Sequence, residues 1–74
     1  MMTDTPRVRS GQVLRLAEAD YRFGVGELTL RVQAVLGLQQ LPDGPWLYVR
    51  GVQIRWDGAD GETRQVLVRL AAIL

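Results

Sequence analysis

The strongest constraint on the fold is a strict alternation of apolar and polar residues between Glu27 and Gln39. Apolar residues occupy every second position of this segment: Leu28, Leu30, Val32, Ala34, Leu36 and Leu38. This period is typical of a strand with one buried face, whereas a helix would need apolar residues three and four apart. A strand of this length has to bend strongly, as in a small barrel, and Gly37 is the predicted position of the bend.

Four other segments show extended patterns, and turn-forming residues separate them. The predicted strands cover Gln12–Ala17, Tyr21–Phe23, Trp46–Trp56 and Glu62–Ala71. Glycine, proline and aspartate are concentrated in the breaks, at Gly24–Gly26, Leu41–Pro45 and Asp57–Gly61, and Glu18–Asp20 is predicted to form a turn or a short helical kink. The sequence therefore predicts an all-β fold: a small antiparallel meander of four to five strands, closing as an SH3-like barrel or a strongly bent sheet. The alternative is a half-open sheet that a second chain must cover.

The segment Trp46–Trp56 changes the parity of its apolar residues midway. Leu47 and Val49 share one parity, whereas Val52, Ile54 and Trp56 share the other. A β-bulge at Arg50–Gly51 would bring both sets to the same face. We therefore expect a bulge at this glycine and place Trp56 in the core.

The length of 74 residues allows one domain, which we place at residues 11–74. Residues 1–10 are mostly polar, are interrupted by Pro6 and are predicted to form a flexible tail. They contain no apolar region typical of a secretory signal, and no stretch of the chain is apolar enough to span a bilayer, so we expect a cytoplasmic protein.

The amino-acid inventory argues against catalysis. The chain has no histidine, cysteine or lysine, and Ser10 is its single serine, so the usual nucleophiles and general bases are missing. The loop Asp57–Glu62 is rich in carboxylates but lacks the length and spacing of a calcium loop, and Gly24–Gly26 lacks the third glycine of a phosphate-binding loop. We predict no enzyme activity, no metal site and no cofactor.

The best candidate contact surface combines aromatic residues with arginines. If Leu47 and Val49 face the core, Trp46, Tyr48 and Arg50 face outward together, with Arg55 nearby. Such surfaces bind protein, or single-stranded nucleic acid through stacking. The structural alternative is that Trp46 closes one end of the barrel while the arginines only solvate the sheet.

The C-terminal strand carries apolar residues at both parities. Leu67, Ala71 and Ile73 are predicted to face opposite to Val66, Val68 and Leu70. A strand buried on both faces lies inside an assembly or beneath another element, and the alternative is a fraying tail. On folding, a domain of this size buries only about 60% of the surface that its unfolded chain exposes. Without disulfides we therefore expect association to support its stability.

These observations predict a non-catalytic binding or adaptor domain that acts by protein–protein association, with itself as the expected partner. The predicted partner-binding residues are Trp46, Tyr48, Arg50, Arg55, Leu67 and Ile73. The alternative is a nucleic-acid-binding barrel whose arginines bind phosphate while Tyr48 or Trp46 stacks on bases. The formal net charge of +1 is small for a dedicated nucleic-acid binder.

Overall fold

Five strands form a single antiparallel sheet in the computed structural model, which describes residues 8–73. The strands are β1 (Val13–Leu16), β2 (Tyr21–Arg22), β3 (Leu28–Leu41), β4 (Gly44–Ile54) and β5 (Asp60–Arg69). Two short 3₁₀ helices, η1 (Glu18–Asp20) and η2 (Leu70–Ala72), complete the described elements. The all-β prediction is therefore confirmed.

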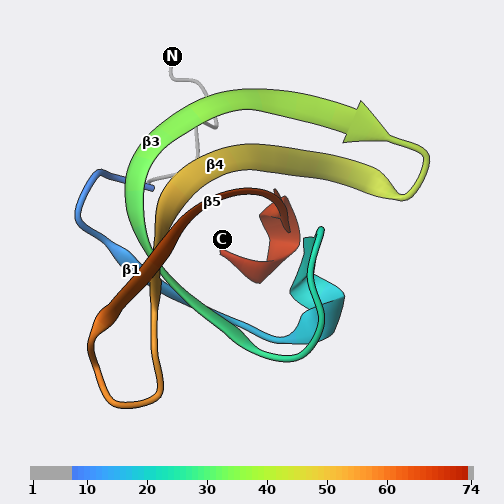
Figure 1. The fold of residues 1–74 in the computed structure, drawn as a ribbon. Helices are drawn as coiled ribbons and strands as arrows, with labels where there is room; N and C mark the ends of the chain where they lie inside the picture. Colours follow the sequence, from blue (N-terminus) through green and yellow to red (C-terminus); the bar gives the residue numbers. More distant parts are fainter. Residues whose placement is uncertain (1–7, 74) are drawn as a thin grey trace.

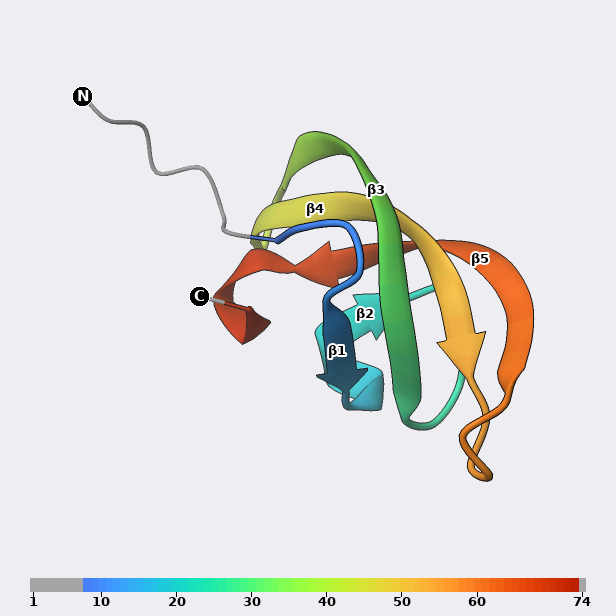
Figure 2. The same ribbon diagram turned by 90° about the vertical axis from the view of Figure 1, so that its left-hand side faces the viewer.

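The sheet has the order β1-β3-β4-β5-β2 and is nearly closed into a barrel. In Figure 1, β3, β4 and β5 curve in the same direction as nested arcs. The two edge strands are consecutive in the chain, because only η1 separates β1 from β2. One N-terminal segment thus pairs with β3 through β1 and with β5 through β2, and Figure 2 shows β1 beside β3. The prediction of a small antiparallel barrel is confirmed, and the narrower SH3-like assignment stays a prediction.

The core lies on the concave face of this sheet. Every strand contributes to it: Leu14, Leu16, Tyr21, Leu28, Leu30, Val32, Leu47, Val49, Val66 and Val68. Val8 and Ile73 pack against its margin from the two ends of the described chain. Of the predicted tail, residues 1–7 lie outside the described residues.

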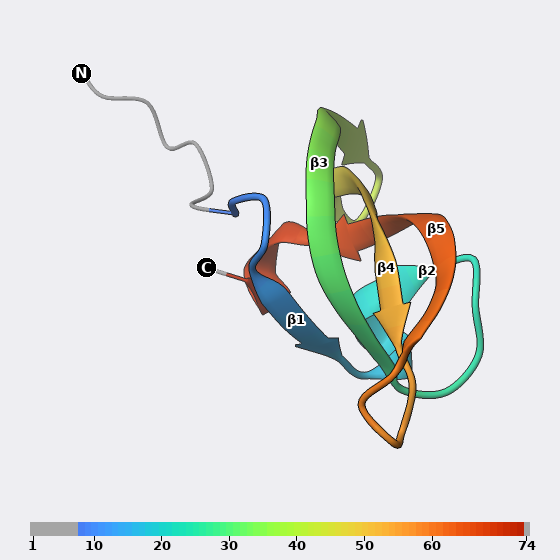
Figure 3. The same cartoon turned by 60° about the vertical axis from the view of Figure 1, so that its left-hand side comes forward.

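The long alternating segment forms the longest strand, as predicted, but its distal half is not buried. β3 spans Leu28–Leu41, and its bend coincides with two register shifts against β4, between Val32 and Ala34 and between Val35 and Gly37. Leu38 is 61% exposed, because β1 pairs only with the first four residues of β3. The far end of β3 therefore extends with β4 past the barrel, as Figure 3 shows.

The ladder does shift register opposite Arg50–Gly51, but the extra residue, Gln33, lies on β3, so the bulge predicted in β4 is wrong, and so are the assignments that depended on it. Gly51 pairs in register with Val32 of β3 and Arg64 of β5, and β4 keeps one parity along its length. Val52 and Ile54 consequently lie on the outer face and are only half-buried. Trp56, predicted to be in the core, follows β4 at the hairpin to β5 and is 94% exposed.

The C-terminal strand ends earlier than the sequence pattern indicates. β5 ends at Arg69 rather than at Ala71, because Leu70–Ala72 turn into η2. This turn brings Ile73 back against the core, where it is half-buried. The turn in the backbone thus lets Ile73 pack against the core, although its position in the sequence predicted the opposite face.

Candidate functional site

The predicted contact residues on β4 share the outer face of the sheet but differ in exposure. Leu47 and Val49 belong to the core, so Trp46, Tyr48 and Arg50 face away from it. Arg50 is exposed and Tyr48 is half-buried, with its hydroxyl donating to Gln65 Oε1 at 2.9 Å. Trp46 is only 2% exposed, so it is not the accessible aromatic that the sequence predicted.

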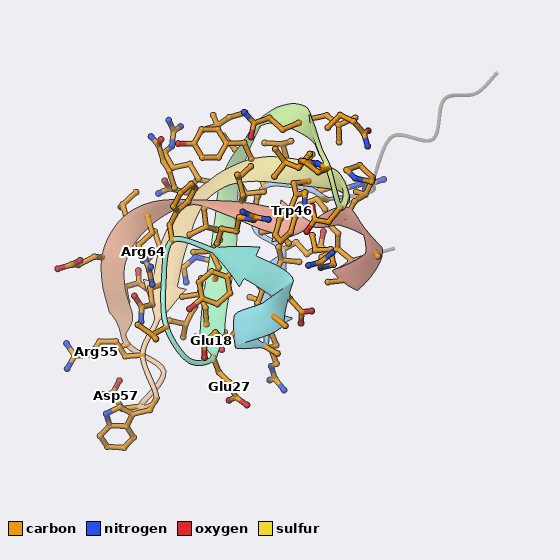
Figure 4. The ribbon with its side chains drawn as sticks, turned by 90° about the vertical axis from the view of Figure 1, so that its right-hand side faces the viewer. Glu18, Glu27, Trp46, Arg55, Asp57 and Arg64 are labelled. Carbon is orange, nitrogen blue, oxygen red and sulfur yellow. The ribbon has the colours of Figure 1, made fainter. Side chains whose placement is uncertain are left out.

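Two arginines and an aspartate from other elements cover Trp46. The guanidinium carbons of Arg22 and Arg69 lie 4.7 Å and 4.5 Å from the indole centroid. The indole Nε1 donates to Asp43 Oδ1 at 2.8 Å, and Asp43 Oδ2 accepts from Arg22 and Arg69 at 3.4 Å and 3.5 Å. Figure 4 shows Trp46 near the C-terminal end of β5, where its ladder partner Arg69 lies. These four residues, hereafter the Trp46 cluster, satisfy one another within a single chain, so they favour a structural role.

The Trp46 cluster gives the domain a specific dependence on pH. The hydrogen bond from Trp46, supported by Arg22 and Arg69, holds the pKa of Asp43 below its ordinary value. The unfolded chain, with a pKa of about 3.9 for aspartate, then takes up this proton before the folded chain does. The stabilising contribution of Asp43 is therefore present above about pH 4 and is lost as the pH falls through the lower pKa of the folded state.

This dependence is testable with Asp43→Asn, which keeps a hydrogen-bond acceptor for Trp46 but carries no charge. The free energy of unfolding should be lower for the variant near pH 6, and the difference from the natural protein should shrink toward pH 2. Denaturant titrations at several pH values measure both quantities. A difference that stays constant over this range would show that Asp43 does not titrate with folding.

Leu67 and Ile73 do not form an exposed apolar surface. Leu67 lies on the outer face of β5 between its ladder partners Tyr48 and Arg22 and is 6% exposed. Ile73 packs against the core on the other side of the sheet. The structure thus separates these two residues and covers both of them within one chain.

A group of exposed apolar residues lies instead on the distal half of β3, toward the β3–β4 hairpin. Val35, Leu36 and Leu38 are exposed there, and we call them, with the backbone edge of residues 33–41, the hairpin surface. Among residues 8–73, this stretch of β3 pairs only with β4, so its other edge has no ladder partner. The feature of the sequence that could have indicated this surface is the absence of any charged residue between Arg31 and Asp43.

A second feature that the sequence did not predict is a groove beside the β4–β5 hairpin. It has a volume of about 600 Å³, and Trp56 and Arg55 of the hairpin line it together with Arg15 of β1 and Glu27. Figure 4 shows Arg55 at the hairpin and Glu27 at the same end of the molecule. The missed signal was the position of Trp56 directly before Asp57 and Gly58, where it lies in the turn beyond the end of β4.

The arginines divide into two groups by their partners. Arg22, Arg31 and Arg69 form ion pairs, and the 2.7 Å contact with Asp60 raises the pKa of Arg31 above its ordinary value. Arg64 donates to the carbonyl of Phe23 at 2.7 Å, which holds this residue at a φ of 80°, a strained value for a bulky side chain. Besides Arg64, the arginines without an ion pair within residues 8–73 are Arg9, Arg15, Arg50 and Arg55.

Comparisons with protein-family models, curated proteins and solved structures gave no match to this chain. Across residues 8–73, no helix has the length and apolar character needed to cross a membrane. The function therefore has to be argued from the surfaces described above.

Proposed function

We propose that this chain is a non-catalytic binding domain that acts by protein–protein association, and that its partner is a second copy of itself bound at the hairpin surface. The observation that carries the proposal is the free edge of β3 along residues 33–41. An unpaired strand edge presents a row of backbone N–H and C=O groups to any strand that can align with it.

A second copy fits this edge because antiparallel pairing is self-complementary. Two β3 edges related by a two-fold axis run antiparallel, so each supplies the hydrogen-bond partners that the other lacks. The stretch Gly37–Leu41 pairs regularly with β4, without a register shift, and it offers a straight ladder for this purpose. The two sheets would then continue into each other.

The apolar side chains of the hairpin surface extend the core face beyond the barrel. Val35 and Leu38 are the ladder partners of Val49 and Leu47, so they lie on the same face of the sheet as these core residues. Within residues 8–73 they remain 42% and 61% exposed, although their neighbours on β4 are buried. A second copy would bury this apolar strip together with the edge.

The composition of the edge supports association rather than protection. Monomeric β proteins commonly place charged residues or proline on exposed edges to prevent pairing. Residues 33–41 contain neither, and the next proline, Pro42, lies in the turn. The small core gives a thermodynamic reason for association. A domain of this size buries little apolar surface by itself, and a partner that binds only the folded state stabilises it.

Light scattering across a range of concentrations tests the proposal. The natural protein should show the mass of a dimer, and Leu38→Lys should raise the dissociation constant at least about tenfold, because it places a charge in the apolar strip. Val25→Lys is the matched control: Val25 is also an exposed aliphatic residue, but it lies in the loop between β2 and β3. The control should keep the mass of the natural protein.

Two results would reject the self-association proposal. One is a monomeric mass for the natural protein at its highest soluble concentration. The other is an unchanged dimer in Leu38→Lys whose far-UV circular dichroism shows that it remains folded. The double replacement of Leu67 and Ile73 is a poor test of association, because Leu67 is buried, Ile73 packs half-buried against the core, and their loss would act on folding.

A further inference from the structure

The groove beside the β4–β5 hairpin brings together side chains of three chemical kinds. Trp56 presents an indole that is 94% exposed, and Arg15 and Arg55 present guanidinium groups that form no ion pair within residues 8–73. Thr29, Gln53 and Glu27 add hydroxyl, amide and carboxylate groups to the lining. The volume of about 600 Å³ lies within the range of small-molecule and cofactor sites.

The exposed Trp56 has no structural role within the described chain. Its side chain is almost fully accessible, and no hydrogen bond or cation–π contact of its indole is present among residues 8–73. This contrasts with Trp46, which is covered by arginines and bonded to Asp43. An accessible indole at the margin of a groove offers a face for stacking on a planar group.

The two arginines of the groove can bind separate anionic groups. β3 lies between β1, which carries Arg15, and β4, which ends just before Arg55. Two inter-strand spacings of about 4.8 Å therefore separate these strands, or about 10 Å in all. Guanidinium groups bind phosphate oxygens through paired hydrogen bonds, so a ligand with successive phosphates can occupy both positions.

We propose that this groove binds single-stranded nucleic acid, with Trp56 stacking on a base and Arg15 and Arg55 binding phosphates. Gln53 and Thr29 can donate to base edges, and the Glu27 carboxylate can accept a hydrogen bond from a base amino group. A duplex keeps its bases stacked on one another, so it cannot present a base to Trp56. The site does not involve the hairpin surface and does not depend on self-association.

Fluorescence anisotropy of a short, labelled single-stranded oligonucleotide of mixed sequence tests the proposal with the full chain. Trp56→Ala should weaken binding roughly 5- to 150-fold, the range expected for the loss of one base–aromatic stack. The double variant Arg15→Gln/Arg55→Gln should lower the salt slope of log K by about 1.4, because each phosphate contact on a single strand contributes about 0.7. Binding should also quench the tryptophan emission of the natural protein, and Trp56→Ala, which keeps only Trp46, should lose this quenching.

Arg50→Gln is the matched control, because Arg50 is an exposed, unpaired arginine of β4 that does not line the groove. It should bind within about twofold of the natural protein if single-charge effects at a distance are screened. Three results would overturn the proposal: no anisotropy change at about 50 mM salt, an effect of Arg50→Gln equal to that of the groove variants, or equal displacement of the probe by duplex DNA or by polyglutamate.

Discussion

Trp46→Ala is expected to lower the free energy of unfolding by about 3–5 kcal/mol, the range for removing a buried large aromatic side chain. The substitution removes the surface on which Arg22 and Arg69 pack and leaves Asp43 without its indole donor. Native domains have total stabilities of about 5–15 kcal/mol, so the expected loss is at least about a fifth of the total. Urea titration followed by far-UV circular dichroism measures the loss.

Trp46→Phe separates packing from hydrogen bonding in the same cluster. It keeps an aromatic ring between Arg22 and Arg69 but cannot donate to Asp43. We expect it to retain more than half of the stability that Trp46→Ala loses. A loss below about 1 kcal/mol for Trp46→Ala would mean that Trp46 is accessible in solution, and its role as a contact residue would have to be reconsidered.

Gly51→Ala is expected to cost about 1–3 kcal/mol, although alanine ordinarily suits a strand at least as well as glycine. A β-carbon at this position would lie 2.6 Å from the carbonyl oxygen of Arg31 and 2.8 Å from Cγ of Leu30. The first contact is with backbone of the neighbouring strand, which cannot move without disturbing the β3–β4 ladder. Gly51 therefore marks a close approach of two strands.

Gly37→Ala is the matched control on the partner strand, measured at a protein concentration at which the chain is monomeric, because Gly37 lies within the hairpin surface. No atom lies within 4 Å of a β-carbon built on Gly37, and this glycine does not have a positive φ. Alanine there should leave the stability unchanged or raise it by about 0.4–1 kcal/mol, through the lower conformational entropy of the unfolded chain. Equal thermal midpoints for both alanine variants would contradict the close approach at Gly51.

The strands and turns were predictable because their signals are local. Alternation predicted β3 to within two residues at its C-terminal end, and Pro42 and Asp43 occupy the predicted turn before Gly44, which has a φ of 123°. The register of β4 was not predictable in this way. A glycine within a strand indicates either a bulge or a close approach, and only the neighbouring strand distinguishes them. Choosing the bulge at Gly51 reversed the predicted face of every residue from Val52 to Trp56.

The exposure of the candidate contact residues depended on partners distant in the chain. The parity of Trp46 was correct, but its burial comes from Arg22 on β2 and Arg69 on β5, which no local pattern places beside it. The same holds for Leu67, whose cover includes residues of β2 and β4. Conversely, Leu36 and Leu38 matched the pattern of a buried face, but the short β1 does not reach them.

The placement of β1 and β2 at opposite ends of the sheet order determines which part of the sheet closes last. β3, β4 and β5 follow one another through short hairpins, so their pairings involve small chain loops. The β2–β5 ladder consists of two pairs, Tyr21 with Val68 and Arg22 with Leu67, and it joins the most distant parts of the sequence. Its loop-closure entropy is the largest in the fold, whereas its ladder is the shortest.

Arg22 also reaches Trp46 and Asp43, so the Trp46 cluster reinforces this weakly paired junction with contacts to β4 and its preceding turn. The barrel is therefore kept closed largely by side chains on its outside, and opening should begin where β2 separates from β5.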